Sequence, residues 1–332
     1  MLVLRHSNPL RKGEGPSTVH PTSSTESDRT RGPVPVTIGA SENKMEVQRD
    51  RDTRANPFSE KKAANLRKTQ SPMKQNPGKR EEPGEREGEV IGVCCAVIHH
   101  PNLAFVGVYA VREKYRGCGI GKEVWDKCMK HVENMNVVIN AVPDKVLLYR
   151  DKGGFPILET EWACVVNETE EPINHEALSN EVPDGVEIVP FQDSHLPAMF
   201  EYDLALIGYD RKLALELNCK EFDSKTFVAF KDGKCVGFGT IKRSCHNVGQ
   251  VGPLYADDPA VAEVMLRTLI ESHPDVKGFA MMTISSNVPA NNFIKKIGCP
   301  TTEECPRLYR KEKVEVDKSK VIAHFDLNFC PY

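Results

Sequence analysis

The apolar positions of this chain fall into short runs and helical periods from Gly88 onward. Apolar runs at residues 90–98 and 103–111, separated by the turn sequence HHPN, predict two adjacent strands. Residues 121–135 carry apolar side chains at helical spacing and predict an amphipathic helix. The face of this helix that we expect to be buried holds Val124, Trp125, Cys128, Met129 and Val132. Further predicted elements are a strand at 137–142, a short helix closed by glycine at 144–155, and a strand at 157–166.

A second series of elements comes after residues 167–185, an acidic and irregular stretch that we interpret as an interdomain linker. The dipeptide Asp232-Gly233, which separates two apolar runs, predicts a β-hairpin. Residues 193–217 have a helical pattern. The other predicted elements are strands at 186–191, 226–230, 234–243, 248–256 and 278–284, and helices at 260–272 and 291–298.

The first 87 residues have almost no apolar periodicity and are rich in Ser, Thr, Pro, Lys, Arg and Glu. Phe58 is the only aromatic residue before Phe105, so this segment cannot bury enough surface to offset its ordering entropy, and we predict a disordered tail. Residues 54–80 hold eight basic residues and one acid, Glu60. This basic stretch is either an arm for nucleic acid and nuclear import or a plain solvated tail; without interleaved aromatic residues we favour the tail.

An internal repeat relates the two series of elements. Three glycines of the first series superpose on three of the second at one offset of 145 residues: Gly88, Gly92 and Gly107 on Gly233, Gly237 and Gly252. Both series continue with an amphipathic helix, a strand and a helix ending in glycine. The sequence therefore indicates the duplication of one α+β unit. We call residues 88–166 the first repeat and residues 186–332 the second repeat.

Composition excludes several classes of protein. Eleven cysteines are scattered without a CxxC pair or a His/Cys quartet, so we expect reduced thiols and no metal site. A net charge of −3 over 332 residues gives no general attraction to nucleic acid, and no nucleic-acid partner is expected. No apolar run reaches the roughly 20 residues of a membrane span, and no secretory signal opens the chain. These features predict an intracellular protein of the cytoplasm or nucleus, with no membrane partner.

The stretch VREKYRGCGIGK, from Val111 to Lys122, carries the chemistry of a phosphate-binding loop. It lies between a predicted strand and a predicted helix, where free backbone amides and the helix dipole favour an anion. Three glycines allow the backbone to approach the anion closely, and Arg116 and Lys122 add positive charge. The spacing matches neither GxxxxGK[ST] nor the dinucleotide fingerprint.

With its preceding strand and its aromatic residue before the arginine, this stretch resembles the acetyl-CoA pyrophosphate loop of the GCN5-related N-acetyltransferases (GNAT). The family pattern is Gln/Arg-x-x-Gly-x-Gly/Ala after a strand that ends in Val. A second family feature lies downstream: a strand ending in Asn140, then Tyr149 and a Gly-Phe pair one residue further away than usual. Residues 186–310 are similar, more weakly, to the C-terminal domain of tandem acetyltransferases of this superfamily.

The resemblance implies acetyl-CoA as the co-substrate and an unidentified amine as the acceptor. The backbone of Tyr109, Ala110 and Val111 is expected to bind the pantetheine arm. The remaining expected cofactor contacts are Arg116, Gly117, Cys118, Gly119, Ile120, Gly121, Lys122 and Asn140. Tyr149 would protonate the departing thiolate, and no covalent enzyme intermediate is needed. The implied function is an acetyl-CoA-dependent N-acetyltransferase in which the amine attacks the thioester directly.

The general base and the acceptor site are less defined in the sequence. Candidates for the base or for acceptor contacts are His99 and His100 in the first turn, and Glu161 on a later strand. Arg211 is a candidate for an anionic acceptor group, or else it forms an internal salt bridge with Asp210 or Glu216.

We therefore predict an α+β fold of two tandem GNAT-like acyl-CoA N-acyltransferase units, each a mixed central sheet flanked by helices. The predicted divisions are a tail at 1–87, a first domain at 88–166, a linker at 167–185 and a second domain at 186–332. The first domain is expected to be N-terminally truncated, since the tail offers no equivalent of the family's leading helices. The second lacks the phosphate loop and has Asp257-Asp258 in its place. The alternative function is a catalytically impaired CoA-binding or interaction protein.

Overall fold

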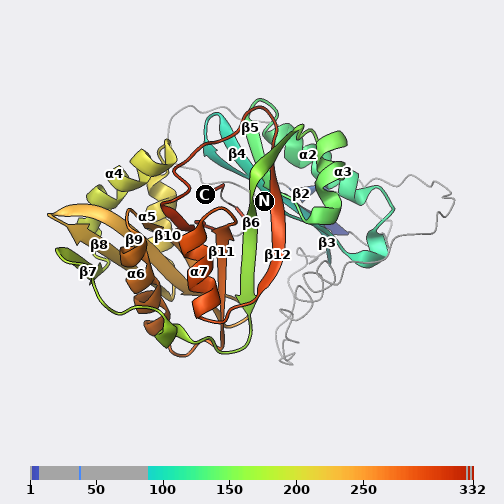
Figure 1. The fold of residues 1–332 in the computed structure, drawn as a ribbon. Helices are drawn as coiled ribbons and strands as arrows, with labels where there is room; N and C mark the ends of the chain where they lie inside the picture. The colour runs from blue at the N-terminus through green and yellow to red at the C-terminus, as the bar shows by residue number, and fades with distance from the viewer. Residues whose placement is uncertain (1, 7–36, 39–88, 327, 330) are drawn as a thin grey trace, which may run out of the picture. The chain divides into compact units, whose positions relative to one another are not determined.

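The structure is a computed structural model that describes residues 2–6, 37–38, 89–326, 328–329 and 331–332 (Figure 1). The chain forms two compact units. We call Met1–Cys95 with Val108–His131 the loop unit, and Ala96–Gly107 with Val132–Tyr332 the main unit. The chain passes between the units within β3 (Glu89–His100) and within β4 (Leu103–Val111).

In the loop unit, two short strands lie inside the predicted tail. β1 (Leu2–His6) runs antiparallel to β3, and β2 (Thr37–Ile38) runs parallel to β1. They pair there because unpaired backbone groups at the edge of β3 accept a further strand. The other residues of the tail lie outside the described residues, and their disorder stays a prediction.

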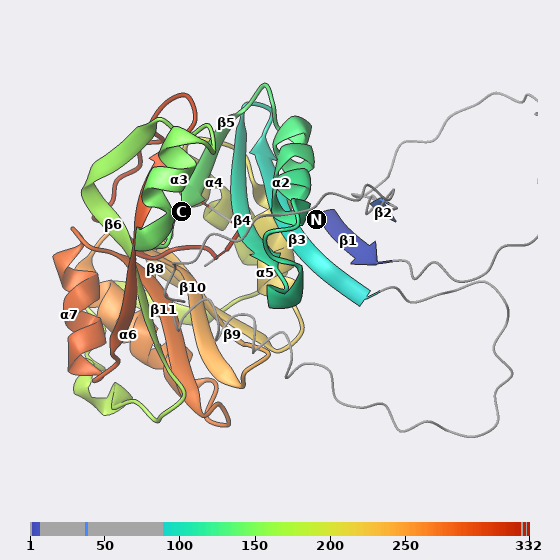
Figure 2. The same cartoon turned by 90° about the vertical axis from the view of Figure 1, so that its right-hand side faces the viewer.

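The helix predicted after the glycine loop is α2 (Ile120–His131). It comes after the short 3₁₀ turn η1 (Glu113–Tyr115) and lies alongside the loop-unit parts of β3 and β4 (Figure 2). Val124, Cys128 and Met129 are buried on its inner face, as the helical spacing predicted. A helix held firmly on this face has a fixed N-terminus, which is the end that adjoins the glycine loop.

The main unit is built on one mixed sheet with the strand order β4-β5-β12-β6-β11-β10-β9-β8-β7. Its strands are β5 (Asn136–Asn140), β6 (Ile157–Thr169), β7 (Val186–Pro190), β8 (Ser224–Lys231), β9 (Lys234–Arg243), β10 (Val248–Ala256), β11 (Gly278–Ile284) and β12 (Thr301–Tyr309), with β13 (Val321–Ala323) paired to β10. Its helices are α3 (Val146–Asp151), α4 (Leu196–Ile207), α5 (Lys212–Lys220), α6 (Pro259–Glu271) and α7 (Val288–Lys296), with 3₁₀ turns η2 (Pro143–Lys145), η3 (His175–Ala177) and η4 (Asp193–His195).

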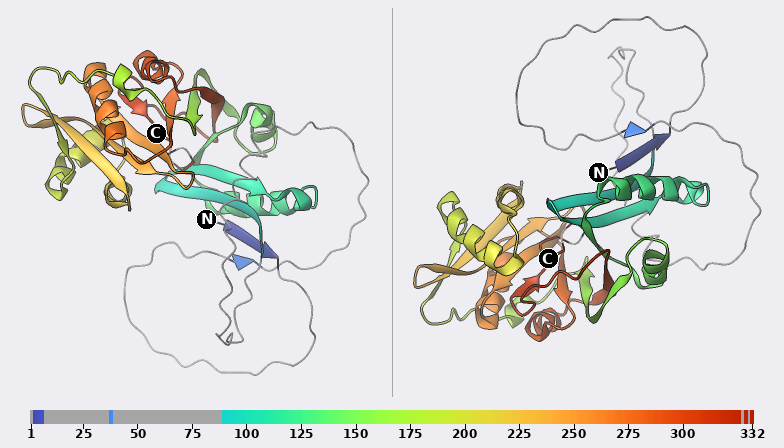
Figure 3. Two further views of the ribbon diagram at one scale, coloured as in Figure 1. Left: turned by 90° about the horizontal axis from the view of Figure 1, so that it is seen from below. Right: turned by 90° about the horizontal axis from the view of Figure 1, so that it is seen from above.

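Helices cover both faces of the second-repeat strands. Along β10 the side chain of Tyr255 joins the core beneath α4 and α5, and that of Leu254 joins the core beneath α6 and α7. Neighbouring residues of a strand point to opposite faces, so the two helix pairs lie on opposite sides of the sheet. Figure 3 shows this arrangement, with the orange α6 and the yellow α4 on either side of the strands.

Strands of the two repeats interleave in the middle of this sheet. β12, from the second repeat, lies antiparallel between β5 and β6 of the first. In turn β6 lies antiparallel between β12 and β11. The repeats therefore do not form separate sheets, and the predicted division at residues 88–166 and 186–332 does not coincide with compact units.

The predicted linker is also partly wrong. β6 continues to Thr169, and Asn167 is buried there, donating from Nδ2 to the main-chain oxygens of Val165 and Met281, each at 3.2 Å. Leu178 is buried in the core beneath α6. These contacts hold Asn167 and Leu178 in the main unit, although the acidic residues around them predicted a linker.

Most other predicted elements are confirmed. The β8–β9 hairpin has the expected tight turn, with positive φ at Asp232 and Gly233. The helical stretch at 193–217 is divided into α4 and α5 at Gly208, whose φ of 84° ends the first helix. β12 and β13 had no counterpart among the predicted elements.

The interleaving predicts that the repeats do not fold apart. If a protease site is inserted at the exposed residues 181–184, the cleaved halves should stay together, because the β6–β11 and β6–β12 ladders cross the cut. Size-exclusion chromatography of cleaved and intact protein should give the same elution volume. Separation into two folded, monomeric fragments would contradict the observed strand order.

Candidate functional site

The glycine loop of the loop unit has the backbone shape of an open anion-binding turn. Gly117 and Gly119 have φ values of 79° and 82°, a region in which residues with a side chain are strained. No atom of the described residues lies within 4 Å of where a Cβ would stand at either glycine. These two glycines are therefore required by the backbone conformation, and the space beside them is open.

The backbone amides of this loop lie at the N-terminus of α2. The first hydrogen bond that closes α2 runs from the Glu123 amide to the Gly119 carbonyl at 3.1 Å. The described part of the chain offers no acceptor to the amides of residues 117–122. Amides that point out of a helix N-terminus carry a partial positive charge, so this turn suits a phosphate group.

Two cations flank these amides. Arg116 is exposed and donates from Nε to the carbonyl oxygen of Val111 at 3.2 Å, where β4 ends. Lys122 pairs with Asp126 one turn along α2, and its side chain is 80% exposed. An exposed pair of this kind contributes little to stability, so Lys122 can turn to a bound anion at small cost.

Gly121 has a different role from the one expected. A Cβ at this position would lie 2.5 Å from the hydroxyl oxygen of Tyr109. The Tyr109 ring meets the Trp125 ring edge to face at 5.3 Å, and partial burial raises the pKa of the Tyr109 hydroxyl. Gly121 thus makes room for a side chain of β4, whereas Gly117 and Gly119 provide the turn itself.

The pairing of β4 with β5 ends just before Tyr109, Ala110 and Val111, the residues that the family resemblance implies for the pantetheine arm. The parallel pairing of these strands runs from Leu103 with Asn136 to Val106 with Ile139. Val108, two residues further along β4, has a φ of 50°, which is rare for a β-branched residue and bends the strand. Strained backbone of this kind is common at functional sites. We call the point after Val106 and Ile139 the fork.

Asn140, the last residue of β5, belongs to a buried polar cluster. Its Oδ1 accepts from Arg307 Nε at 2.9 Å and from Cys164 Sγ at 3.2 Å. Arg307 comes from β12, and its side chain is fully buried. The Asn140 side chain is therefore held by residues that sequence reasoning did not select.

The Arg307 guanidinium lies 4.7 Å from the ring centres of both Trp162 and Tyr332. Among the described residues no carboxylate pairs with it, and its Nη1 makes no hydrogen bond of normal geometry there. Burial alone would lower the pKa of Arg307, but Cys164, Tyr332 and Tyr309 beside it raise the pKa overall. Arg307 is thus a buried cation that aromatic faces and neutral polar atoms stabilise.

Tyr149 lies half-buried on α3. Gly153 packs against its backbone, and Gly154 takes a φ of 85°, which absorbs the extra residue before Phe155. Glu161 is exposed on β6, whereas its neighbour Glu159 is buried and pairs with Lys313 at 2.8 Å. Tyr149, Glu161 and Asn140 belong to the main unit, and the glycine loop to the loop unit.

The second repeat has its own fork, and the chain itself fills it. The parallel pairing of β10 with β11 ends at Val251 with Met281. Beyond that point Leu254 and Tyr255 pair with β13, and the Ala256 amide donates to the Lys320 carbonyl at 3.1 Å. On the other side the His324 amide donates to the Met282 carbonyl at 3.0 Å.

By the repeat offset of 145 residues, Leu254, Tyr255 and Ala256 correspond to Tyr109, Ala110 and Val111. β13 therefore pairs with the backbone that would face a pantetheine arm in the second repeat. The turn before α6 is also closed, because the Asp258 side chain accepts from the Ala260 amide at 2.8 Å and caps the helix.

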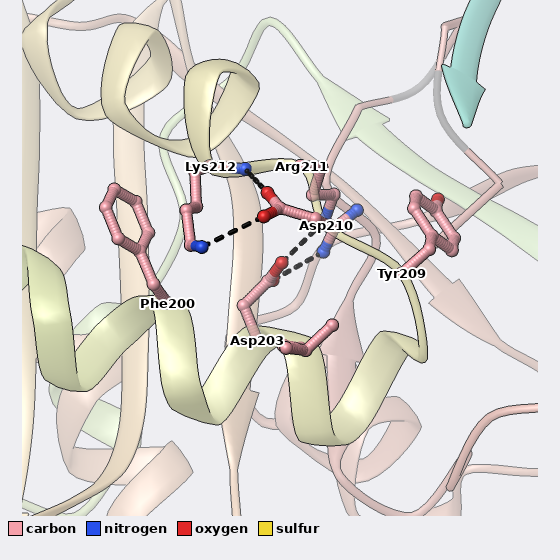
Figure 4. A pocket seen from close by; sticks show the side chains of 7 residues that line it. Phe200, Asp203, Tyr209, Asp210, Arg211 and Lys212 are labelled. Carbon is pink, nitrogen blue, oxygen red and sulfur yellow. Dashed lines mark hydrogen bonds and ion pairs between the residues drawn. The ribbon is translucent and has the colours of Figure 1, made fainter. Parts of the chain in front are cut away.

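Arg211 is buried in the main unit, and its salt-bridge partner is neither Asp210 nor Glu216. It donates to the two carboxylate oxygens of Asp203 at 2.9 and 2.8 Å, as Figure 4 shows. Asp210 pairs with Lys212 instead, and Glu216 with Lys220, so the expected pairing of Arg211 with either acid is wrong. The cause is helix geometry, since the break at Gly208 turns Arg211 back toward α4.

Further donor groups of Arg211 reach beyond Asp203. Nη2 donates to the hydroxyl of Tyr255 at 2.9 Å, and Nη1 donates to the main-chain oxygen of Tyr332 at 2.9 Å. The guanidinium also lies 4.6 Å from the ring centre of Phe325. Arg211 thus connects α4, β10, Phe325 and Tyr332.

His99 is the better defined of the two candidate histidines. Its Nε2 hydrogen-bonds to the main-chain oxygen of Phe329 at 2.6 Å, and burial lowers its pKa to about 4. At neutral pH the His99 ring is therefore uncharged, which a general base requires. His100 is exposed.

Comparison with known proteins identifies the architecture. The family description "Acetyltransferase (GNAT) family" matches residues 51–145, and "Acetyltransferase (GNAT) domain" matches residues 199–323. The first match begins before Gly88, the expected start of the first domain. Together the two matches cover more than half of the chain.

Two curated relatives match about two thirds of the chain. An uncharacterized protein of Caenorhabditis elegans is 26% identical over 227 residues, covering 64% of this chain and 70% of that protein. The Holothin acyltransferase of a Pseudoalteromonas species is 23% identical over 235 residues, covering 71% of this chain and 76% of that protein.

Solved structures share the fold. A Pyrococcus horikoshii protein assigned to the acetyltransferases superposes with a TM-score of 0.55 at 21% identity, over 72% of this chain and 76% of that one. A tandem GNAT protein from the clavulanic acid biosynthesis pathway gives a TM-score of 0.50 at 13% identity, over 68% and 80%. In the described part of the chain, no helix is long and apolar enough to span a membrane, and no metal-binding cluster of His, Cys, Asp or Glu is present.

The buried histidines predict a stability that decreases in acid. Burial lowers the pKa of His99 to about 4 and that of His324 well below 6.5, so between these values the unfolded chain binds more protons than the folded one. The free energy of unfolding should therefore fall as the pH decreases below 6.5, by at most about 1.4 kcal/mol per pH unit for each histidine.

Urea unfolding between about pH 7 and about pH 5 measures this slope above the range in which carboxylates titrate. The slope should be shallower in His99→Gln and unchanged in His246→Gln, since His246 is exposed. An equal slope in wild type and His99→Gln would show that His99 does not carry the effect.

Proposed function

This chain belongs to the GNAT superfamily of acyltransferases as a protein with two GNAT domains in tandem, and we propose that it is an acetyl-CoA-dependent N-acetyltransferase. The acceptor is an amine that attacks the thioester directly. The first repeat binds the co-substrate, and the second supports the site without binding a second CoA.

The open glycine loop is the observation that carries this proposal. The amides of residues 117–122 have no acceptor in the described part of the chain, and open space adjoins Gly117 and Gly119. The pyrophosphate of CoA would add two adjacent negative groups, which suit these amides together with Arg116 and Lys122. The residues present therefore fit the cofactor.

The chain's own residues support the remaining steps. The backbone of Tyr109, Ala110 and Val111 lies on β4 after the fork, where it can hydrogen-bond to the pantetheine amides. Acetyl-CoA supplies a thioester that an unprotonated amine can attack. His99 is uncharged at neutral pH and can take a proton from the amine, and Tyr149 is the candidate to protonate the leaving thiolate.

The second repeat completes the first structurally. β12 inserts Arg307 next to Asn140 at the end of β5, and β13 fills the fork of the second repeat. The proposed division of labour is therefore one cofactor site and one supporting repeat.

A CoA-binding protein without catalysis is the second candidate. One observation favours it: the main-chain oxygen of Asn328 lies against Gly107, directly after the fork, closer than any side chain at residue 107 would allow. A chain that keeps this segment in place would bind CoA without access for an amine.

Binding of CoA should depend on the glycine turn. Gly119→Glu strains a positive-φ position and places a carboxylate beside the proposed pyrophosphate site, so the dissociation constant for acetyl-CoA should rise more than about tenfold. Gly233→Glu is the matched control, because Gly233 has a φ of 74° and equally open space in the β8–β9 hairpin of the main unit. Isothermal titration calorimetry measures both; equal losses of affinity would exclude the loop as the specific site.

Turnover separates the two candidate functions. Release of CoA thiol from acetyl-CoA in the presence of a panel of amines should be detectable, and Tyr149→Phe should lower kcat by roughly 10- to 100-fold with little change in KM for acetyl-CoA. CoA binding without turnover on any amine would favour the non-catalytic candidate. An unchanged kcat in Tyr149→Phe would remove Tyr149 from the mechanism.

A further inference from the structure

The described residues of the segment 326–332 lie against the fork of the first repeat without joining the sheet. Asp326 Oδ1 accepts from the amides of Asn328 and Phe329 at 2.8 and 3.0 Å, which shapes a turn. This turn brings the Asn328 main-chain oxygen against Gly107 and the Phe329 main-chain oxygen to His99. The described residues of the segment make no strand ladder, so side-chain contacts and single hydrogen bonds hold it.

The segment ends in a specific pocket for Tyr332, which is 1% exposed. One face of its ring meets the guanidinium of Arg307, and its ring stacks on His324 at 5.9 Å with an interplanar angle of 17°. Trp162 is also 5.9 Å away. The Tyr332 hydroxyl donates to the Val314 carbonyl at 2.6 Å, and its main-chain oxygen accepts from Arg211.

The pocket has the chemistry of a ligand site rather than of an ordinary core. Burying a cation without a carboxylate partner costs folding free energy, yet Arg307 is fully buried with none among the described residues. The faces of aromatic rings compensate part of this cost. A second buried arginine, Arg211, offers a donor to the oxygen of whatever group fills the pocket. Planar groups with an oxygen acceptor satisfy both arginines.

The location of the segment adds a functional constraint, which rests on the proposed function. The thioester is expected on β4 after the fork, and an amine must reach it there. Gly107 is the first residue after the last β4–β5 pair, and residue 328 covers it. The Nε2 atom of His99, the candidate base, hydrogen-bonds to the main-chain oxygen of Phe329 in the same segment.

We propose that Asn328, Phe329 and Tyr332 occupy the acceptor-binding site of the first repeat and leave it when the acceptor binds. Tyr332 stands in for the acceptor's recognition group, a planar ring linked to an oxygen acceptor or an anionic oxygen in the place of the main-chain oxygen of Tyr332. Arg307 and Trp162 select the ring, and Arg211 selects the oxygen.

Exchange of the segment can be tested without any enzymatic assay. In a chain that ends at Phe325, a synthetic peptide of residues 326–332 should bind saturably and change the fluorescence of Trp162. The same peptide with Tyr332→Ala should bind at least about tenfold more weakly, and Trp162→Phe in the protein should abolish the signal. Absence of binding by the unaltered peptide, or equal binding of both peptides, would overturn the proposal.

A second variant keeps the test valid if the shortened chain does not fold. Tyr332→Ala in the full chain should leave a vacant ring site next to Arg307. The probe 4-hydroxyphenylacetate should then raise the Tm of this variant and not that of the wild type. Cyclohexylacetate, of similar size and charge but without an aromatic face, should raise it much less. Equal effects of the two probes, or no effect of either, would contradict the assigned ring chemistry.

Kinetics then connect the site to the reaction. The 326–332 peptide should inhibit the shortened chain competitively with the amine and not with acetyl-CoA. If the peptide binds but the chain shows no turnover, the binding site is supported and the proposed function is refuted. If the chain turns over and the bound peptide does not compete with the amine, the acceptor site is refuted and the acetyltransferase function is supported.

Discussion

β12 is hydrogen-bonded on both sides, to β5 along one edge and to β6 along the other, so a strand of the second repeat completes the sheet of the first. This insertion brings Arg307 to Asn140 at the end of β5, and it keeps β6 paired with β11. The chain that leaves β12 is then placed to run through the second fork as β13 and on to the first fork. The ladders of β12 with β5 and β6, and of β6 with β11, thus connect the two repeats.

The two repeats differ at the turn that follows the corresponding strands β4 and β10. In the first repeat the amides of the turn after β4 meet no acceptor among the described residues, and in the second the corresponding turn is closed by the Asp258 cap. The β10–β11 fork holds β13, whose backbone satisfies hydrogen bonds that a pantetheine arm would otherwise make. The chain thus supplies its own strand to the backbone of Leu254 and Tyr255 in the second repeat.

The sequence predicted most of this fold, because local signals encode it. Apolar runs located β4, β10 and β11, and the glycine pattern located the loop and its open turn. β12 escaped prediction because its sequence, TTEECPRLY, alternates weakly and contains a proline; its partners come from far along the chain. For the same reason no local pattern distinguished Arg307 from a surface arginine. The pairing of Arg211 with Asp203 was not predicted, because it depends on the break between α4 and α5 at Gly208.

The central claim is that two repeats share one cofactor site, and the stoichiometry of acetyl-CoA binding tests it most directly. Isothermal titration calorimetry on the full chain should give one acetyl-CoA per chain, since β13 occupies the second fork and the Asp258 cap closes the second turn. Two equivalents per chain would contradict the account, because both forks would then be open. No binding at all would contradict it equally, because the glycine loop would then hold no cofactor.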